Sequence, residues 1–253
     1  MVAVCRPRVI LWRDTDPLSA GATITELMTG LSATFLISYL LGSVSFAILV
    51  SRLRGLSDPR SYGSGNPGAT NMLRTGDKRA AALTLIGDAA KGWLAIMVFH
   101  ALLLPGAASV EEANEWLAVA AIAVFLGHLF PVFFQFKGGK GVATALGVLL
   151  GLSPLLGVAS LAVWLVVFGL SRISSLSALS AALAAPLLPL LGLGYGSLSQ
   201  NPADQPDPAL VVLDPLWWAI VAMSLLLLAR HRRNFQDLFQ GKEKPVGLDK
   251  DSS

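Results

Sequence analysis

Hydrophobic residues fall in long unbroken blocks along the chain, without the one-sided stripes of an amphipathic helix or the alternation of a strand. Such blocks approach the roughly 20 residues that a helix needs to cross a bilayer. A membrane β-barrel would instead show alternating segments of about ten residues. The pattern predicts an all-α integral membrane protein, a bundle of about seven transmembrane helices. The expected spans are residues 30–50, 80–104, 116–134, 142–152, 155–170, 176–193 and 215–229.

The block from residue 142 to residue 170 has two interpretations. It is either one long tilted helix or two short helices that turn at Ser153 and Pro154. Two short helices bring every polar segment of the chain to one side of the bilayer, as the charges described next require. The sequence therefore favours two helices here.

Charges between the blocks are sorted by sign. Lys and Arg occupy four segments, residues 51–79, 135–141, 171–175 and 230 onward, whereas segments 105–115 and 194–214 carry Asp or Glu and neither Lys nor Arg. Because basic loops stay in the cytoplasm, the N-terminus is expected outside and the C-terminus inside. Only 14% of residues are charged, against about 25% in a soluble domain, which supports the membrane assignment.

The first 28 residues fit this arrangement poorly. Arg6, Arg8 and Arg13 would lie outside, and the segment lacks the apolar run of a signal peptide. A translation start at Met28 would explain this, and the sequence leaves both starts open. We expect an N-terminal extension over residues 1–28, a membrane domain over residues 29–244 and a cytoplasmic tail over residues 245–253.

Cysteine and histidine are too scarce for a metal centre. The one cysteine, Cys5, excludes an internal disulfide and a Cys-based cluster. The histidines, His100, His128 and His231, offer no pair on one helical turn. We therefore expect neither metal nor cofactor, and no nucleic-acid partner.

The first basic segment contains GSGNPGATN at residues 63–71, followed by Arg74. Its glycines allow backbone conformations closed to other residues, so amide groups can turn toward a ligand. Arg74 offers a bidentate guanidinium for phosphate or carboxylate. A flexible loop with ordinary turn chemistry is the plain alternative. The candidate substrate-binding positions here are Gly65, Asn66, Thr70 and Asn71, with Ser64 and Arg74 as candidate catalytic residues.

The second segment, FKGGKGVAT at residues 136–144, places a glycine run before an expected helix. A helix N-terminus with uncapped amides suits a phosphate. The P-loop pattern GxxxxGK[ST] is absent and no strand precedes the segment, so we exclude an NTPase. A helix-start turn with snorkelling lysines remains the alternative. The candidate residues are Gly138, Gly139, Lys140 and Gly141.

Other polar residues accompany these two segments. Asp88 and Lys91 are three residues apart inside an expected span, where ionisable side chains are costly and usually functional. His128 also lies within a span, and we assign these three a supporting role. His231 and Asn234 share a helical face. Two anion-binding segments and a histidine suit a phosphate-bearing substrate, with electrostatics and proximity supplying most of the rate.

Five segments together resemble a known family. They are GSVSFAILVSRLRGLSDPRSYGSGNPGATNMLR, GDAAKG, GHLFPVFFQFKGGKGVAT, RISSLSAL and RHRRNFQDLFQGKEK. In their order and spacing, the chain is similar to the bacterial glycerol-3-phosphate acyltransferases that use acyl phosphate as donor, over roughly residues 40–244. The histidine followed five positions later by aspartate, typical of soluble-type glycerolipid acyltransferases, is absent here.

The resemblance implies an activity and roles for residues. An acyl group would pass from acyl phosphate to the sn-1 hydroxyl of glycerol 3-phosphate, giving lysophosphatidic acid and phosphate, the first step of phospholipid synthesis. Ser64 and Asn66 would contact the phosphate-bearing substrates, and Arg74 would clamp glycerol phosphate. The amides of Gly138 and Gly139, with Lys140, would hold the acyl-phosphate headgroup. Further positions carried over are Ser175 as substrate-binding, His231 and Asn234 as the C-terminal pair, and Glu243 as supporting.

The resemblance also implies a setting. The enzyme would lie in the bacterial inner membrane, next to membrane lipid and with its active site facing the cytoplasm. A soluble enzyme that forms acyl phosphate would supply the donor. The family shows no obvious protein base, so the substrate's phosphate would accept the hydroxyl proton. Lys244 directly follows Glu243, whereas the family places that lysine two residues after the glutamate. A transporter of organic phosphates is the alternative, although it should show inverted repeats and a midplane site.

Overall fold

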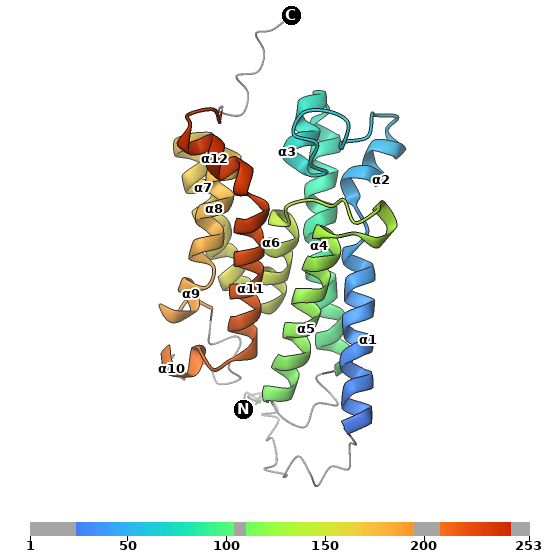
Figure 1. Ribbon diagram of the computed structural model, residues 1–253. Coiled ribbons are helices and arrows are strands. Elements are labelled where there is room, and N and C mark those ends of the chain that lie inside the picture. Colours follow the sequence, from blue (N-terminus) through green and yellow to red (C-terminus); the bar gives the residue numbers. More distant parts are fainter. Residues whose placement is uncertain (1–23, 104–109, 195–207, 244–253) are drawn as a thin grey trace, which may run out of the picture.

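The computed structural model describes residues 24–103, 110–194 and 208–243, and in these residues the chain is helical without any strand (Figure 1). This confirms the all-α prediction. The N-terminal extension up to residue 23 and the tail from residue 244 lie outside the described residues. The helices are α1 Ile24–Gly42, α2 Phe46–Leu53, α3 Ala69–Met72, α4 Lys78–Leu103, α5 Val110–Leu129, α6 Val142–Leu152, α7 Pro154–Ser171, α8 Ser174–Ala184, α9 Leu187–Leu190, α10 Pro208–Val211, α11 Pro215–Arg230 and α12 Arg232–Phe239, with 3-10 turns at Leu73–Thr75 and Val132–Phe134.

Four segments of the described chain are long and apolar enough to cross a membrane: Met28–Leu53, Lys78–Ala101, Glu112–Phe134 and Pro154–Ser171. Three shorter apolar helices accompany them, Val142–Leu152, Ser174–Ala184 and Pro215–Arg230. Each coincides with one of the seven expected blocks. The helical membrane protein is therefore established, while the number of crossings stays a prediction.

The chain turns between α6 and α7, as the two-helix interpretation requires. Ser153 is the N-cap of α7, and its hydroxyl accepts a hydrogen bond from the backbone N–H of Leu156 at 3.4 Å. Pro154 occupies the first helical position, where a missing N–H costs nothing. The Ser-Pro pair therefore ends one helix and starts the next.

Three expected spans contain a break in the α-helix. The block 30–50 breaks at Ser43–Ser45, where the buried ammonium of Lys91 donates to the carbonyl of Val44 at 2.6 Å. The block 116–134 leaves the α-helix after Leu129, just before Pro131, and the block 176–193 stops at Ala184, just before Pro186. Proline lacks the N–H that a helix continues with. A hydropathy pattern does not register such breaks, because the residues around them remain apolar.

Small residues let the helices of the bundle approach closely. α4 packs along α6, and a Cβ atom built on Gly147 would lie 1.9 Å from the carbonyl oxygen of Ala89. The same helices also meet at Gly92, where a Cβ would lie 2.3 Å from the carbonyl oxygen of Thr144. Close helix packing through small residues is the usual solution in lipid. It brings the middle of α4 against the start of α6.

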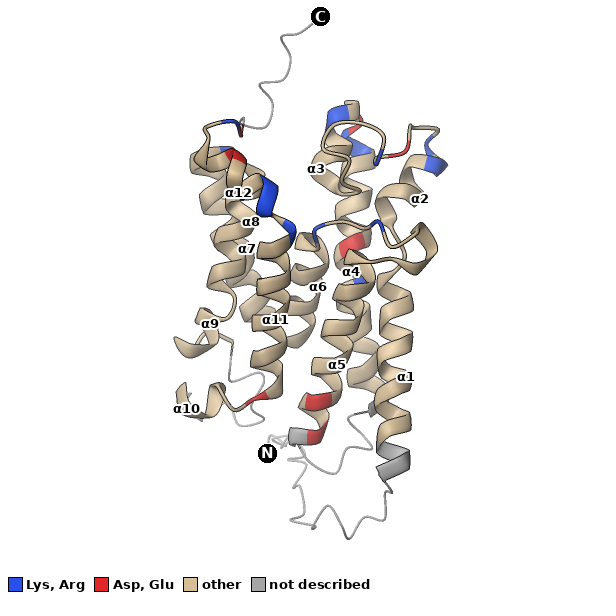
Figure 2. Ribbon diagram, in the orientation of Figure 1, with Lys and Arg blue, Asp and Glu red and all other residues tan. Residues whose placement is uncertain are grey.

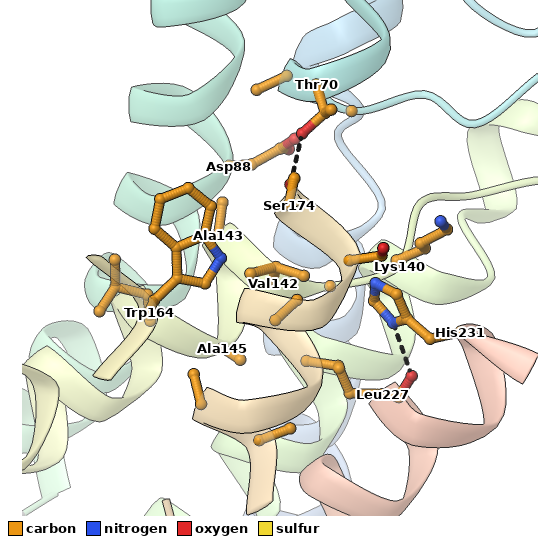
Figure 3. A pocket seen from close by; sticks show the side chains of 18 of the residues that line it. Thr70, Asp88, Lys140, Val142, Ala143, Ala145, Trp164, Ser174, Leu227 and His231 are labelled. Atoms are coloured by element: carbon orange, nitrogen blue, oxygen red, sulfur yellow. Dashed lines mark hydrogen bonds between the residues drawn. The ribbon is translucent and has the colours of Figure 1, made fainter. Parts of the chain in front are cut away.

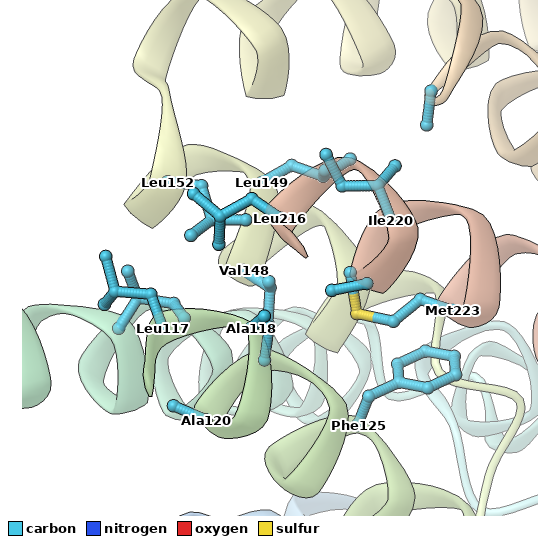
Figure 4. Close-up of a cluster of buried hydrophobic side chains, with 14 of the residues drawn as sticks. Leu117, Ala118, Ala120, Phe125, Val148, Leu149, Leu152, Leu216, Ile220 and Met223 are labelled. Carbon is cyan, nitrogen blue, oxygen red and sulfur yellow. The ribbon is translucent and has the colours of Figure 1, made fainter. Parts of the chain in front are cut away.

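The buried apolar core lies between α5, α6 and α11 (Figure 4). Val148 of α6, Ile220 and Met223 of α11, and Phe125 of α5 are all less than 4% exposed. Because lipid tails are as apolar as these side chains, packing and not the hydrophobic effect holds the helices together. This core supports the polar end of the bundle described next.

Basic residues gather at the end of the bundle that carries α3 and α12 (Figure 2). The opposite end carries Glu115 at the start of α5 and Asp214 before α11, and no Lys or Arg among the described residues. The four basic segments that lie far apart in the sequence thus meet at one end.

Candidate active site

A cavity of about 380 Å³ opens where the basic segments meet and continues between the helices (Figure 3). Its two ends differ in chemistry. The polar end combines most of the residues singled out from the sequence: Ser64, Asn66, Thr70, Asn71, Arg74, Asp88, His128, Lys140, Gly141, Ser175, His231, Asn234 and Glu243. The other end is an apolar groove, whose lining includes Val142, Leu146, Leu149, Leu161, Trp164, Leu165, Ala178, Ala181, Ala182, Ala185, Ile220, Met223 and Leu227.

The loop before α3 is shaped by the buried side chain of Asn71. Its amide Nδ2 donates to the carbonyl oxygens of Pro59 at 2.7 Å and Tyr62 at 3.2 Å, and its Oδ1 accepts from the N–H of Ser64 at 3.0 Å. These bonds commit the Asn71 amide to the loop. They shape the loop that carries Ser64 and Asn66 to the cavity. Asn71 also lines the cavity, and its contact with substrate stays a prediction.

Arg74 follows this loop and reaches the cavity from an exposed position. No carboxylate of the described residues lies within ion-pair distance of it. The guanidinium of Arg74 is therefore available to an anionic ligand.

Thr70 lies across the cavity from α8, and its hydroxyl is 3.1 Å from the hydroxyl of Ser174 at the start of that helix (Figure 3).

The glycines before α6 are packed against the end of α5. The N–H of Gly139 donates to the carbonyl of His128 at 3.2 Å, and the binding of a ligand by the glycine amides stays a prediction. Neither Gly138 nor Gly139 lines the cavity. A Cβ on Gly138 would lie 2.1 Å from the His128 carbonyl oxygen, and one on Gly139 2.3 Å from Nε2 of that histidine. Only glycine fits the loop this closely against α5.

Arg230 supports the site from outside the cavity lining, a role that the sequence analysis missed. Its guanidinium donates to the carbonyl oxygen of Gly138 at 2.9 Å and to that of Gly139 at 3.0 Å. It also lies over the ring of Phe130, 5.5 Å from the centroid. Arg230 immediately precedes His231, but in the sequence it looked like an ordinary topology charge. It holds the glycine loop against the end of α11.

The first turn of α6 faces the cavity. Gly141 is its N-cap with φ of 90°, no side chain caps the helix, and Val142 and Ala143 line the cavity. The N-terminus of such a helix carries a partial positive charge and N–H donors that suit a phosphate. Such donors at the cavity belong to the first turn of α6, whereas Gly138 and Gly139 lie outside the cavity lining.

Lys140 stands next to this helix start. Its ammonium donates to Oδ1 of Asn234, and Nδ2 of Asn234 donates to a carboxylate oxygen of Glu243, so three expected residues form one chain of contacts. Burial lowers the pKa of the Lys140 ammonium, while the negative charge of Glu243 acts to raise this pKa. Asn234 thus fixes the direction of the Lys140 side chain.

His231 is buried at the junction of α11 and α12, with 2% of its surface exposed. Its Nδ1 lies 2.9 Å from the carbonyl oxygen of Leu227 (Figure 3). A carbonyl only accepts, so Nδ1 carries the proton and Nε2 remains an acceptor. Burial, assisted by the nearby positive charge of Lys140, lowers the pKa of His231 to about 4. The imidazole is therefore neutral at pH 7.

Protein stability should depend on pH through His231. An unfolded chain takes up this proton near pH 6.5, whereas the folded protein takes it up only near pH 4. The resulting stabilisation is complete above pH 6.5 and is lost as the pH falls toward 4, by up to about 3 kcal/mol. Thermal unfolding in detergent at pH 7.5 and pH 5 should show a smaller difference for His231→Gln than for the wild type. Equal differences would contradict the assignment.

Three further polar residues lie deeper. Ser175 is 7% exposed and lines the cavity, and its hydroxyl has no hydrogen-bond partner in the described part of the chain. Lys91 does not line the cavity; its ammonium lies 2.9 Å from Oδ1 of Asp88, and Nδ1 of His128 lies 3.6 Å from the same oxygen. Gly65 is likewise outside the cavity lining. The supporting role expected for Asp88, Lys91 and His128 takes the form of one buried cluster.

The family model described as glycerol-3-phosphate acyltransferase matches residues 32–241. The chain belongs to this family. It is 53% identical to a glycerol-3-phosphate acyltransferase of Ralstonia nicotianae over 210 residues, which are 83% of this chain and 91% of the relative. Identity to the Bordetella pertussis enzyme of the same name is 51%, over 92% of this chain and all of the relative.

Solved structures of this acyltransferase family share the fold. The crystal structure of PlsY, an integral membrane glycerol 3-phosphate acyltransferase in its glycerol 3-phosphate form, matches with a TM-score of 0.70 at 32% identity. That match covers 86% of this chain and 96% of the other. The lysophosphatidic acid form of the same protein matches with a TM-score of 0.69 at 31% identity, over 86% and 95% of the two chains.

Proposed function

We propose that this protein transfers an acyl group from acyl phosphate to the sn-1 hydroxyl of glycerol 3-phosphate, giving lysophosphatidic acid and phosphate. The observation that carries the proposal is the shape of the cavity, in which a cationic end continues into an apolar groove. Acyl phosphate has the same two parts, a charged headgroup and a hydrocarbon chain. With the headgroup bound at Lys140, the hydrocarbon chain would lie in the groove beside Trp164.

The polar end divides between two phosphates. Arg74, with Ser64 and Asn66, binds the phosphate of glycerol 3-phosphate, and Lys140 with the start of α6 binds the phosphate of the donor. Ser175, whose buried hydroxyl lacks a partner, donates to a substrate oxygen. Holding both reactants in one orientation can supply roughly 7–11 kcal/mol of the barrier. Hydrogen-bond donors that are already in place around the charge of the transition state stabilise it further.

The proton of the attacking hydroxyl goes to the substrate. With a pKa of about 4, His231 is a weak base at pH 7, and an effective general base has a pKa near the working pH. The C1 oxygen bonds to the acyl carbon, the bond from that carbon to the phosphate oxygen breaks, and the departing phosphate takes the proton. His231 Nε2 accepts a hydrogen bond from that protonated phosphate.

The enzyme spans the bacterial inner membrane seven times, with the N-terminus outside, the C-terminus in the cytoplasm and the site facing the cytoplasm. The gathering of Lys and Arg at the cavity end supports this orientation (Figure 2). Residues 29–244 form the membrane unit with all of the site residues. Membrane lipid surrounds it, and a soluble enzyme supplies the acyl phosphate.

The purified enzyme should release phosphate from palmitoyl phosphate only when glycerol 3-phosphate is present, and EDTA should leave the rate unchanged. Chromatography of the lipid product should give lysophosphatidic acid in equal amount to phosphate. Sealed inverted membrane vesicles should use added glycerol 3-phosphate directly, because they present the cytoplasmic face. Equal activity with acyl-CoA, or loss of activity in EDTA, would refute the proposal.

A further inference from the structure

Among the described residues, two carboxylates line the cavity, Asp88 and Glu243, and Glu243 accepts a hydrogen bond from Asn234. Asp88 lies on α4, is 3% exposed and lines the cavity on the side of Thr70 (Figure 3). The Lys91 ammonium at 2.9 Å and the His128 ring at 3.6 Å balance its charge. Oδ1 is fully buried beside these two groups, whereas Oδ2 receives no hydrogen bond within the described part of the chain.

Both neighbours of Asp88 are engaged elsewhere. Lys91 makes its shorter contact, 2.6 Å, with the carbonyl of Val44 in the break between α1 and α2. The His128 ring is fixed against Gly139, where there is no room for a Cβ atom. A buried carboxylate normally receives several hydrogen bonds, and an unfilled acceptor is costly. Oδ2 of Asp88 therefore retains capacity for a donor that comes from the cavity.

The chemistry of the substrates restricts what that donor is. A carboxylate repels phosphate, so Asp88 does not belong to either phosphate site. This inference rests on the proposed function: in that reaction the fully ionised phosphates and the acyl chain have no donors, and the hydroxyls of glycerol 3-phosphate are the donors. A charge-assisted hydrogen bond to one of them would fill the vacant position on Asp88.

We propose that Asp88 accepts a hydrogen bond from the C2 hydroxyl of glycerol 3-phosphate, the hydroxyl that is not acylated. With the phosphate held by Arg74, this second contact fixes the rotation of the three-carbon unit and turns the C1 hydroxyl toward the donor. Lys91 and His128 are positioning residues that hold the Asp88 carboxylate in place. Asp88 is thereby the residue that distinguishes glycerol 3-phosphate from an acceptor with a single hydroxyl.

The test compares two acceptors, glycerol 3-phosphate and 3-hydroxypropyl phosphate, which lacks only the C2 hydroxyl. Because a hydrogen bond to a charged group is strong, the wild type should prefer glycerol 3-phosphate by about tenfold or more in kcat/KM. In Asp88→Asn this preference should fall to less than about threefold, since the charge of the acceptor is lost. The loss should come from glycerol 3-phosphate, with the rate on the analogue little changed.

Asp88→Glu provides the second variant. It keeps the charge beside Lys91, so it should remain folded, but it moves the carboxylate by one methylene and should also reduce the preference. Asp77→Asn is the matched control, because Asp77 caps the same helix, pairs with Arg54 and lies outside the cavity lining. Its preference should equal that of the wild type.

Two results would overturn the inference. The first is an unchanged preference in Asp88→Asn or Asp88→Glu. The second is an equal loss of kcat/KM on both acceptors, which would indicate that Asp88 acts as a structural residue or as a general base. A wild type that uses both acceptors equally well would refute the role of Asp88 and leave the proposed function intact. A wild type inactive on glycerol 3-phosphate would refute the proposed function itself.

Discussion

Replacing Arg74 with alanine is expected to lower kcat/KM for glycerol 3-phosphate by roughly 100- to 1,000-fold, because two charge-assisted hydrogen bonds to phosphate are worth about 3–4 kcal/mol. Arg74 lines the cavity and has no carboxylate partner in the described chain, so removing it leaves no other group unpaired. The protein should fold normally. Steady-state rates with varied glycerol 3-phosphate measure the effect.

Arg79→Ala is the matched control for Arg74. Arg79 is exposed at the start of α4 and does not line the cavity, so this variant removes the same charge from the same end of the bundle. It should retain wild-type rates. Arg74→Lys should recover only part of the lost activity, because an ammonium cannot form the bidentate contact. Equal losses in Arg79→Ala and Arg74→Ala would indicate general electrostatic attraction and not a specific clamp.

Lys140→Met should have an effect of similar size on the chemical step. Its ammonium lies beside the start of α6 and receives its direction from Asn234. Removing one fixed positive charge that stabilises the transition state usually lowers kcat by about 100- to 1,000-fold. We expect kcat to fall by this factor with palmitoyl phosphate, while the protein remains monodisperse in detergent.

Lys137→Met separates this effect from a general loss of charge. Lys137 belongs to the same loop, is exposed and lies outside the cavity lining. Its replacement should leave kcat within about twofold of the wild type, as is usual for surface positions away from structural contacts. If Lys137→Met and Lys140→Met behave alike, the donor phosphate is not bound at the start of α6.

Much of the site could be predicted from short sequence segments. Ser64, Asn66, Arg74, Lys140, His231 and Asn234 all line the cavity, because glycine-rich polar segments in an apolar chain have few roles other than binding. The Ser153-Pro154 turn was also predictable, since its capping chemistry is local. The hydrogen bond from Gly139 to His128 was not predictable, because it joins residues from different elements.

The apolar part of the site carried no sequence signal. Trp164, Ala181 and Met223 line the groove, yet in a chain that is 54% hydrophobic they resemble every other lipid-facing or core residue. Arg230 was hidden for the corresponding reason, since basic residues at the ends of spans also set topology. Residue type identifies a site only where the type is rare in its surroundings.

The sequence by itself determined the helical membrane class, the gathering of basic segments and the family, because hydropathy, charge and motif order are properties of the chain. The tertiary structure alone decided which groups share the cavity. Asp88 shows the difference: its spacing to Lys91 indicated a buried ion pair, while its place in the cavity wall depends on the close packing of α4 against α6. Long-range packing decides this, since it brings together side chains that no local pattern relates.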